Sequence, residues 1–250
     1  MNKIRVGFFS ATSYAGDPEP YVAWHQLDHM PEQFRVPGLS WGQRFFATPG
    51  CVAASAHRVG PLGTACHLQT YLFETYEPVM SEFVALGRAL AGLGRSMPGA
   101  LSHLQVSLQL VSEHVAPRVL LTPGAVPFRP NTGVYVVLED VPNRTAASEW
   151  LVQQQRDALP TLLEIPGVFG IWTFAAVAPP GQAGAYDVPA STQQLMIMYL
   201  DGDPIEVSDA LAAHLAPRWE AAPVLPLFAG AFRSLFPPPE RFCRIDDPEY

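Results

Sequence analysis

The sequence is poor in charge, and its basic residues are the scarcer kind. Charged residues make up 15% of the 250 residues, and 15 lysines and arginines stand against 23 aspartates and glutamates, which gives a formal net charge of −8. Proteins that bind nucleic acid need clustered Lys and Arg side chains to neutralise phosphates. We therefore expect no nucleic acid among the partners of this chain.

Long apolar runs and paired cysteines are also missing. A membrane-spanning helix needs about 20 consecutive apolar residues, and the apolar stretch near the N-terminus ends before Ser10. That stretch is too short for the core of a signal peptide and is better explained as a first strand. Three cysteines without a C-x-x-C pair predict neither a disulfide scaffold nor a structural zinc site. These features predict a cytoplasmic protein that contacts no membrane.

The chain does contain two related halves. Residues 21–47 align without a gap with residues 150–176, at a constant shift of 129. Positions that carry the same residue in both halves are Asp28/Asp157, Pro31/Pro160, Pro37-Gly38/Pro166-Gly167, Phe45/Phe174 and Ala47/Ala176. Prolines and glycines in register are informative because they restrict backbone geometry. The sequence therefore predicts two copies of one structural unit.

Each copy shows the same order of predicted elements. β-branched and aromatic residues favour strands, and Pro-Gly pairs mark the breaks between elements. The first copy has predicted strands at 4–9, 39–46 and 66–74 and helices at 20–34 and 78–93. The second copy has strands at 133–138, 168–176 and 193–200 and helices at 146–163 and 204–215. This β-α-β-β-α order, with a short closing strand, predicts a ferredoxin-like α+β unit.

The two copies differ in length after their second helix. Residues 114–118 resemble residues 214–218 at a shift of 100, so we expect an insertion over about 88–113 in the first copy. Its centre, 103–112, fits both the alternating apolar pattern of a strand and the apolar spacing of a helix, and we interpret it as a helix. The expected units are 1–128 and 129–250, the second with a proline-rich C-terminal tail, and the segments 119–128 and 224–236 can supply closing strands or cover the sheet.

Pairing of the two units has a physical reason. A four-stranded sheet with helices on one face leaves its other apolar face open to water. Packing two such faces together is favourable by about 25 cal/mol for each Å² buried. The two antiparallel sheets are therefore expected to form an intramolecular barrel, and a further homodimer remains an open expectation.

The first helix and the strands after it resemble a known superfamily. Residues 24–31, Trp-His-Gln-Leu-Asp-His-Met-Pro, lead to Pro37-Gly38, to Gln43-Arg44-Phe45 and to Tyr-Leu-Phe-Glu at 71–74. This pattern resembles the dimeric α+β barrel superfamily, and within it the EthD-like proteins, in a tandem two-copy form. The resemblance implies the fold, but activity only broadly, because the superfamily includes lyases, isomerases, polyketide cyclases, cofactor-free monooxygenases and haem enzymes.

Three polar residues of the first copy are candidates for catalysis. His29 matches the helix histidine of the resembled family and can transfer protons near neutral pH. Arg44 can hold a carboxylate or enolate oxygen, and Tyr71 can act as a phenolic donor. The second copy has Ala158 and Thr173 in place of His29 and Arg44, so only the first copy is expected to carry a site.

His25 completes the candidate catalytic set, one turn before His29. At 100° per residue, the helix presents one apolar stripe, made of Ala23, Leu27, Met30 and Phe34. His29 lies at the flank of this stripe and His25 lies nearly opposite to it. His29 is therefore the better candidate to face a pocket, with a structural hydrogen-bonding role as the alternative.

Aromatic residues are candidates to line an apolar pocket. Trp24, Phe45 and Phe73 are expected to contact substrate, although the same side chains would also serve as barrel core.

Metal and cofactor binding are not expected. An i, i+4 histidine pair such as His25 and His29 can bind a metal, but no H-E-x-x-H pattern and no third ligand of diagnostic spacing occurs. Walker-type and G-x-G-x-x-G loops are absent too.

The leading hypothesis is a cofactor-independent enzyme of the lyase, isomerase or monooxygenase type. Its substrate would be an apolar or aromatic catabolic intermediate, with His29 as acid/base, Arg44 as oxyanion or carboxylate holder and Tyr71 as auxiliary donor. A non-catalytic ligand-binding or assembly protein of the same fold is the alternative. Metal- or haem-dependent oxidation is a further one, for which His67, His103 or His114 would have to supply an axial ligand.

Overall fold

The computed structural model describes residues 2–96, 99–141, 149–150, 152–176, 192–221 and 224–235. The strands of the first copy are β1 (Val6–Tyr14), β2 (Leu39–Phe46), β3 (His57–Arg58), β4 (His67–Phe73) and β5 (Ala100–Val115). Its helical segments are α1 (Glu19–Trp24), the π-helical turn η1 (His25–His29), α2 (Met30–Gln33), α3 (Pro49–Ala53), η2 (Pro61–Thr64) and α4 (Val79–Gly92).

A 3-10 segment, η3 (Pro123–Phe128), leads into the second copy. The strands of this copy are β6 (Gly133–Asp140), β7 (Val168–Ala176), β8 (Gln194–Leu200) and β9 (Leu225–Ser234). Its helical segments are the π-helical turn η4 (Gln154–Ala158), α6 (Leu159–Glu164) and α7 (Pro204–Ala221). The predicted α+β order of strands and helices is confirmed in both copies.

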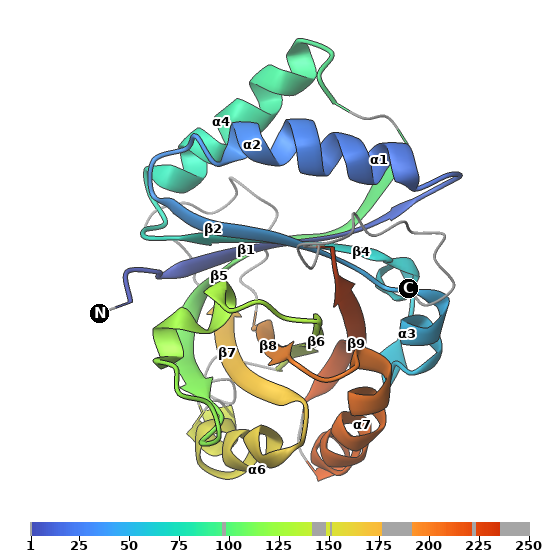
Figure 1. Ribbon diagram of the computed structural model, residues 1–250, viewed down its shortest axis with the longest axis vertical. Coiled ribbons are helices and arrows are strands. Elements are labelled where there is room, and N and C mark those ends of the chain that lie inside the picture. Colours follow the sequence, from blue (N-terminus) through green and yellow to red (C-terminus); the bar gives the residue numbers. More distant parts are fainter. Residues whose placement is uncertain are drawn as a thin grey trace.

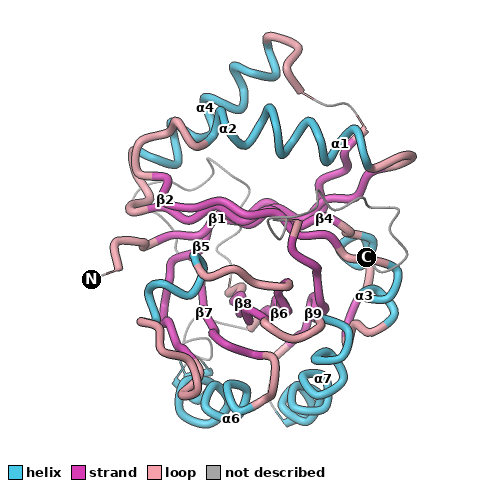
Figure 2. The backbone as a smooth tube through the Cα atoms, viewed as in Figure 1, coloured by secondary structure: helices cyan, strands magenta, loops and turns pink. Residues whose placement is uncertain are grey.

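The strands form one closed antiparallel barrel with helices on its outside. The first copy contributes the order β2-β4-β1-β5 and the second the equivalent order β7-β8-β6-β9. Strand β5 pairs with β7, and β9 pairs with β2, so each copy joins the other at both edges. Helices α1, α2 and α4 cover one outer face, and α6 and α7 cover the other (Figures 1 and 2). Two ferredoxin-like repeats thus shield the inner faces of each other's sheets.

The shift of 129 reappears in the backbone. The π-helical turns at His25–His29 and Gln154–Ala158 differ by that number, and so do the starts of β2 and β7. Gly38 and Gly167, which precede these strands, have φ angles of +87° and +93°, a conformation that favours glycine. The duplicated glycine therefore marks the same left-handed turn in both repeats, as the aligned sequence predicts.

One segment folds differently from expectation. Residues 103–112 are strand rather than helix, because they lie within β5. The alternating side chains Leu104, Val106 and Leu108 pack on the barrel core, and β5 fills the edge position beside β1 that β9 fills beside β6. The supposed insertion thus contains the closing strand of the first repeat.

The likeness between residues 114–118 and 214–218 is not a structural equivalence. The first segment includes the end of β5, and the second lies inside α7. The unit boundaries near residue 128 stay a prediction, and the proline-rich tail from residue 236 lies outside the described residues.

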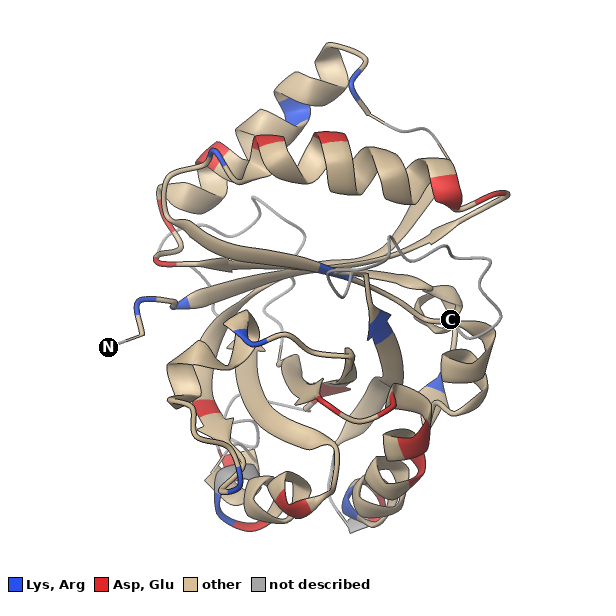
Figure 3. Ribbon diagram, in the orientation of Figure 1, with Lys and Arg blue, Asp and Glu red and all other residues tan. Residues whose placement is uncertain are grey.

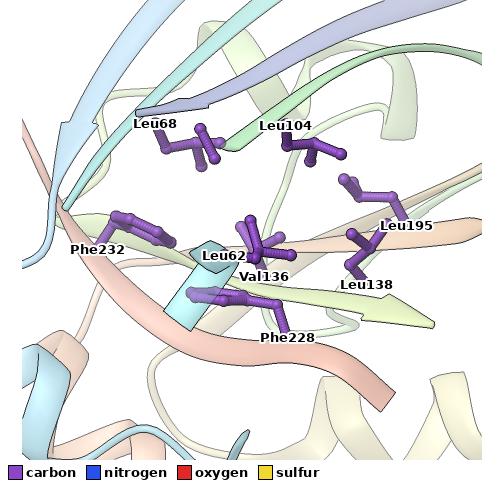
Figure 4. Close-up of a pocket in the computed structure, with 9 residues that line it drawn as sticks. Leu62, Leu68, Leu104, Val136, Leu138, Leu195, Phe228 and Phe232 are labelled. Carbon is purple, nitrogen blue, oxygen red and sulfur yellow. The ribbon is translucent and has the colours of Figure 1, made fainter. Parts of the chain in front are cut away.

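Apolar side chains fill the barrel interior. A cavity of about 20 Å³ lies between the two sheets (Figure 4). Its lining is entirely apolar: Ala11, Leu62, Leu68, Leu104, Val136, Leu138, Leu195, Phe228 and Phe232. A cavity of this volume has room for about one water molecule, and a site without polar partners stays dry. The interior is therefore packed core.

Charged residues are found mainly in the helices, the loops and the ends of the strands, and few of them lie within the strands in this view (Figure 3). Within the described residues, no helix is long and apolar enough to cross a membrane.

Candidate functional site between the first helix and its sheet

The π-helical turn η1 decides which side chains the first helix buries. Tyr21, His25, Met30 and Gln33 face the sheet and are buried, whereas Leu27 is 58% exposed. Residues on one face of a regular α-helix are three or four positions apart, whereas His25 and Met30 are five apart. The π-helical turn accommodates the extra residue and so brings both side chains to the same face. The expectation that His25 lies opposite the core stripe and Leu27 within it is therefore wrong.

Strand register places three polar side chains opposite this helix. Arg44 on β2 pairs with Gln69 on β4. His67 and Tyr71 lie two residues to either side of Gln69, so both share its face of the sheet and are diagonal neighbours of Arg44. Arg44, His67 and Tyr71 are 1%, 0% and 3% exposed. They form the sheet side of a buried polar cluster.

Aromatic rings surround the histidines of this cluster. The Tyr21 ring lies 5.1 Å from the His67 ring and 6.1 Å from the His25 ring, between centroids. Trp24 stacks on His29 at 4.8 Å, and His29 lies 5.1 Å from His25. The cluster therefore combines flat apolar surfaces with ring nitrogens.

Arg44 is the electrostatic centre of the cluster. Its Nη1 donates to the carbonyl oxygen of Val22 at 3.1 Å, and its guanidinium lies 5.2 Å from the Tyr21 ring centroid. Its Nε and Nη2 are buried without a hydrogen-bond partner. None of the ion pairs among the described residues involves Arg44. Burial lowers the pKa of Arg44 to about 10, so this buried guanidinium stays charged at neutral pH, and no acidic side chain among the described residues pairs with it.

The three histidines are uncharged near neutral pH. Burial, followed by repulsion from Arg44, lowers the pKa of His67 to about 3 and holds the pKa of His25 well below its ordinary value. The pKa of His29 is lowered for the same two reasons. A neutral imidazole offers one donor and one acceptor, so each ring can donate one hydrogen bond and accept another. Burial also raises the pKa of Tyr71, which keeps its hydroxyl protonated.

The structure brings some of the predicted residues together and separates others. His25, His29, Arg44, Tyr71 and Trp24 all lie at this helix–sheet interface. Residue alternation along β2 directs Phe45 to the other face from Arg44, where it belongs to the barrel core. Phe73 belongs to the apolar cluster under the helices that also contains Tyr71, and both rings pack against Phe83, at 5.2 and 5.0 Å between centroids. Phe45 therefore does not line the polar cluster, whereas Phe73 lies in the apolar packing around Tyr71.

Sequence reasoning did not place two members in the cluster: His67, which was considered only as an axial ligand for haem, and Gln33. His67 is fully buried with both ring nitrogens unpartnered, and the buried Gln33 lies with its Nε2 3.1 Å from His29 Nε2. His67 could have been identified by comparing equivalent positions of the two repeats. Phe46 and Ala175 are equivalent in the two copies, and strand register pairs Phe46 with His67 and Ala175 with Gln194. His67 of the first copy therefore corresponds to Gln194 of the second.

The second repeat lacks the cluster. Thr173 takes the place of Arg44, and Met198, paired with Ile171, takes the place of Tyr71, which pairs with Gly42. The polar set is therefore not a requirement of the fold.

Metal and haem do not fit these side chains. Among the described residues, no group of three His, Cys, Asp or Glu side chains could hold a metal ion. An axial histidine needs a porphyrin-sized space before its nitrogen and usually donates its other N–H to a fixed acceptor. The rings of His25, His29, Tyr21 and Trp24 pack with centroids 4.8 to 6.1 Å apart, which leaves no porphyrin-sized opening among them, and both His67 nitrogens lack an acceptor among the described residues.

A second concavity lies at the start of β2. It has a volume of about 540 Å³ and is lined by Asn2, Lys3, Ile4, Ser40, Glu74, Glu113, Thr122, Pro123, Gly124, Ala125 and Phe128. Ser40 is the centre of a Gly-Leu-Ser-Trp-Gly segment, which matches the G-x-S-x-G pattern. A nucleophilic serine of that type sits on a sharp strand-to-helix turn, whereas Ser40 lies within β2. No histidine lines this cleft, so it offers no activated nucleophile.

Comparisons with known proteins bear on the fold. No family model and no curated protein matches the sequence. An anthrone oxidase-like protein matches with a TM-score of 0.54 at 10% identity, over 93% of this chain and 91% of the other. A provisionally named chlorite dismutase matches with a TM-score of 0.56 at 9% identity, over 92% and 94%. A DypB variant from Rhodococcus jostii RHA1, in complex with heme, matches with a TM-score of 0.52 at 13% identity, over 91% and 92%. These matches show that the chain has the dimeric α+β barrel fold in a tandem form.

Proposed function

We propose that this chain is a small-molecule enzyme that needs no cofactor and carries out acid–base chemistry at the helix–sheet interface of its first repeat. One observation carries the proposal: a buried arginine with no counter-ion in the described part of the chain lies beside neutral histidines in one repeat, and the equivalent position in the other repeat is Thr173. A buried unpaired charge is costly, and such costs are typical of functional sites. Assignment to the EthD-like branch is part of this proposal, supported by His29 and Arg44.

His29 is the proton-transferring residue. It is only half-buried, unlike His25 and His67, and so is the histidine that an entering molecule reaches first. Its Nδ1 has no partner, while Gln33 engages its Nε2. If the amide oxygen of Gln33 accepts from Nε2–H, Nδ1 is a base; if the amide nitrogen donates to Nε2, Nδ1 carries the proton and is an acid. Rotation of one amide therefore sets the role of the ring.

Arg44 and Tyr71 act on the oxygen where negative charge develops. Removing a proton from carbon next to a carbonyl group, or from a phenol, leaves an oxyanion. The free N–H groups of Arg44 and the unpartnered Tyr71 hydroxyl are the donors available for it. Fixed donors in a site without water stabilise such charge strongly. The rings of Tyr21 and Trp24 suit an apolar or aromatic substrate body.

Deuterium exchange tests the proposal without knowledge of the substrate. The protein is incubated in D₂O with a pool of aromatic and enolisable small molecules, and mass spectrometry follows deuterium uptake or conversion. We expect at least one compound to change with the wild-type protein and with His214→Gln, whose histidine lies on the exposed face of α7. His29→Gln should lose the change. Full activity of a folded His29→Gln variant would refute the role of His29, and binding without any change would favour a ligand-binding protein.

A further inference from the structure

The free atoms of Arg44 define the shape of its missing partner. Its Nη1 is occupied by the Val22 carbonyl, and its Nε and Nη2 are the two buried nitrogens without partners. These two nitrogens share one edge of the planar guanidinium, along which their N–H bonds run parallel. Such an edge binds two coplanar oxygens of one group at once. The geometry therefore assigns this edge to a two-oxygen group rather than to the single oxyanion of the proposed function, for which the unpartnered Tyr71 hydroxyl remains as the donor.

The charge around this edge limits the charge of the partner. Arg44 is the charged group of the cluster, because His25, His29 and His67 all have lowered pKa values and are neutral near pH 7. A monoanion balances one guanidinium. A phosphate dianion would leave one uncompensated negative charge in a buried site, at a cost of several kcal/mol. The partner that fits is a carboxylate.

His67 is placed to donate a further hydrogen bond to a carboxylate bound at Arg44. It is completely buried, neither ring nitrogen has a partner, and register places it diagonally across β2 and β4 from Arg44. The Tyr21 ring contacts both, at 5.1 Å from the imidazole and 5.2 Å from the guanidinium carbon. The Phe46 ring packs against His67 at 5.1 Å. A carboxylate on Arg44 would therefore lie within an aromatic frame, next to an imidazole N–H.

We propose that the substrate is an apolar or aromatic carboxylate, held by the Nε/Nη2 edge of Arg44 and by the ring N–H of His67. This inference rests on the proposed function, and it adds His67 as a binding residue that touches the substrate. It also explains why no acidic side chain of the described residues pairs with Arg44: the carboxylate belongs to the ligand.

Matched ligand pairs test this assignment. Benzoate and 2-naphthoate are each compared with the amide of the same ring, using calorimetry and the ¹H–¹⁵N signal of the arginine Nε–H groups. We expect at least one carboxylate to bind and to shift one Nε–H signal, and its amide to bind at least about 10-fold more weakly, because it lacks the charge. Equal binding of acid and amide, or no binding of either acid, would overturn the proposal.

Variants locate the bound carboxylate. Arg44→Lys keeps the positive charge but cannot form the bidentate pair of hydrogen bonds. His67→Phe keeps an aromatic ring but has no N–H group. Each should weaken carboxylate binding by about 10-fold or more, since each loses a hydrogen bond to a charged group, which is the stronger kind of hydrogen bond. Arg35→Lys, at a side chain that is 81% exposed, should bind like the wild type. Unchanged binding in Arg44→Lys would overturn the assignment.

His29→Gln separates this inference from the proposed function. It should still bind the carboxylate while it loses proton transfer. Deuterium exchange by the wild type without carboxylate binding would refute this inference alone. Carboxylate binding without any exchange would support this inference and contradict the catalytic role.

Discussion

Replacing Arg44 by methionine should make the ligand-free protein more stable. Burial puts the pKa of Arg44 at about 10, which is roughly 2.5 pH units below the ordinary value, and at about 1.4 kcal/mol per unit the charged form is destabilised by roughly 3 kcal/mol. Since pH 7 lies below both the folded and the unfolded pKa, the guanidinium is charged in both states and the full penalty applies. The penalty would be relieved only as the pH rises above about 10.

The methionine variant also loses favourable contacts. The hydrogen bond to Val22 contributes about 1 kcal/mol, and the cation–π contact with Tyr21 about 1 kcal/mol. Methionine is flexible and fills irregular apolar space. We therefore expect Arg44→Met to raise the free energy of unfolding by about 1–2 kcal/mol, while carboxylate binding is lost. Such an exchange of stability for function is common at active sites.

Urea unfolding at pH 7 measures this effect. Arg35→Met, at an exposed arginine, is the control and should change the free energy of unfolding by less than about 0.5 kcal/mol. If Arg44→Met unfolds at a lower urea concentration than the wild type with an unchanged slope, Arg44 is compensated in the folded protein, and the reasoning above is refuted.

Three further predictions concern the buried polar groups and their support. Because the pKa of His67 is lowered in the folded protein, the histidine is protonated in the unfolded chain at a higher pH than in the folded chain. Its contribution to the free energy of unfolding should therefore be full above about pH 6.5 and fall by about 2 kcal/mol by pH 5. Urea unfolding at pH 7.5 and 5.0 should show that His67→Phe loses less stability between these pH values than the wild type does. A Cβ at Gly42 would lie 2.9 Å from Tyr71 Cδ1, so Gly42→Ala should cost about 1–3 kcal/mol, whereas Gly87→Ala, with nothing within 4 Å, should be neutral or stabilising by thermal unfolding. Glu139 accepts from the indole N–H of Trp150 at 2.9 Å and of Trp219 at 2.7 Å. Glu139→Leu should cost about 2–4 kcal/mol, because the buried Trp150 donor and the partly buried Trp219 donor lose their acceptor, and Glu139→Gln should cost less in the same urea assay.

Local patterns were sufficient to predict most of the fold. Prolines and glycines at a shift of 129 identify the duplicated helix and strand, because these residues restrict the backbone in the same way in both copies. The left-handed glycines at 38 and 167 show this directly. The alternating and helical patterns of 103–112 could not be separated by periodicity alone. The deciding factor was the open edge of β1, which β5 fills.

The candidate site was only partly predictable, for two physical reasons. The π-turn changes the phase of the helix after His25, and no propensity scale marks that change, so His25 was expected at the surface. His67 meets Arg44 through strand register, a contact between segments far apart in sequence that has no local motif. Phe45 was misassigned to the pocket because residue type on a strand does not identify its face.

A crystal structure of the protein with a bound aromatic carboxylate tests the central claim most directly. We predict that both carboxylate oxygens contact Nε and Nη2 of Arg44 and that His67 donates to one of them. A carboxylate bound elsewhere, or an Asp or Glu side chain of this chain occupying that edge of Arg44, would contradict the claim.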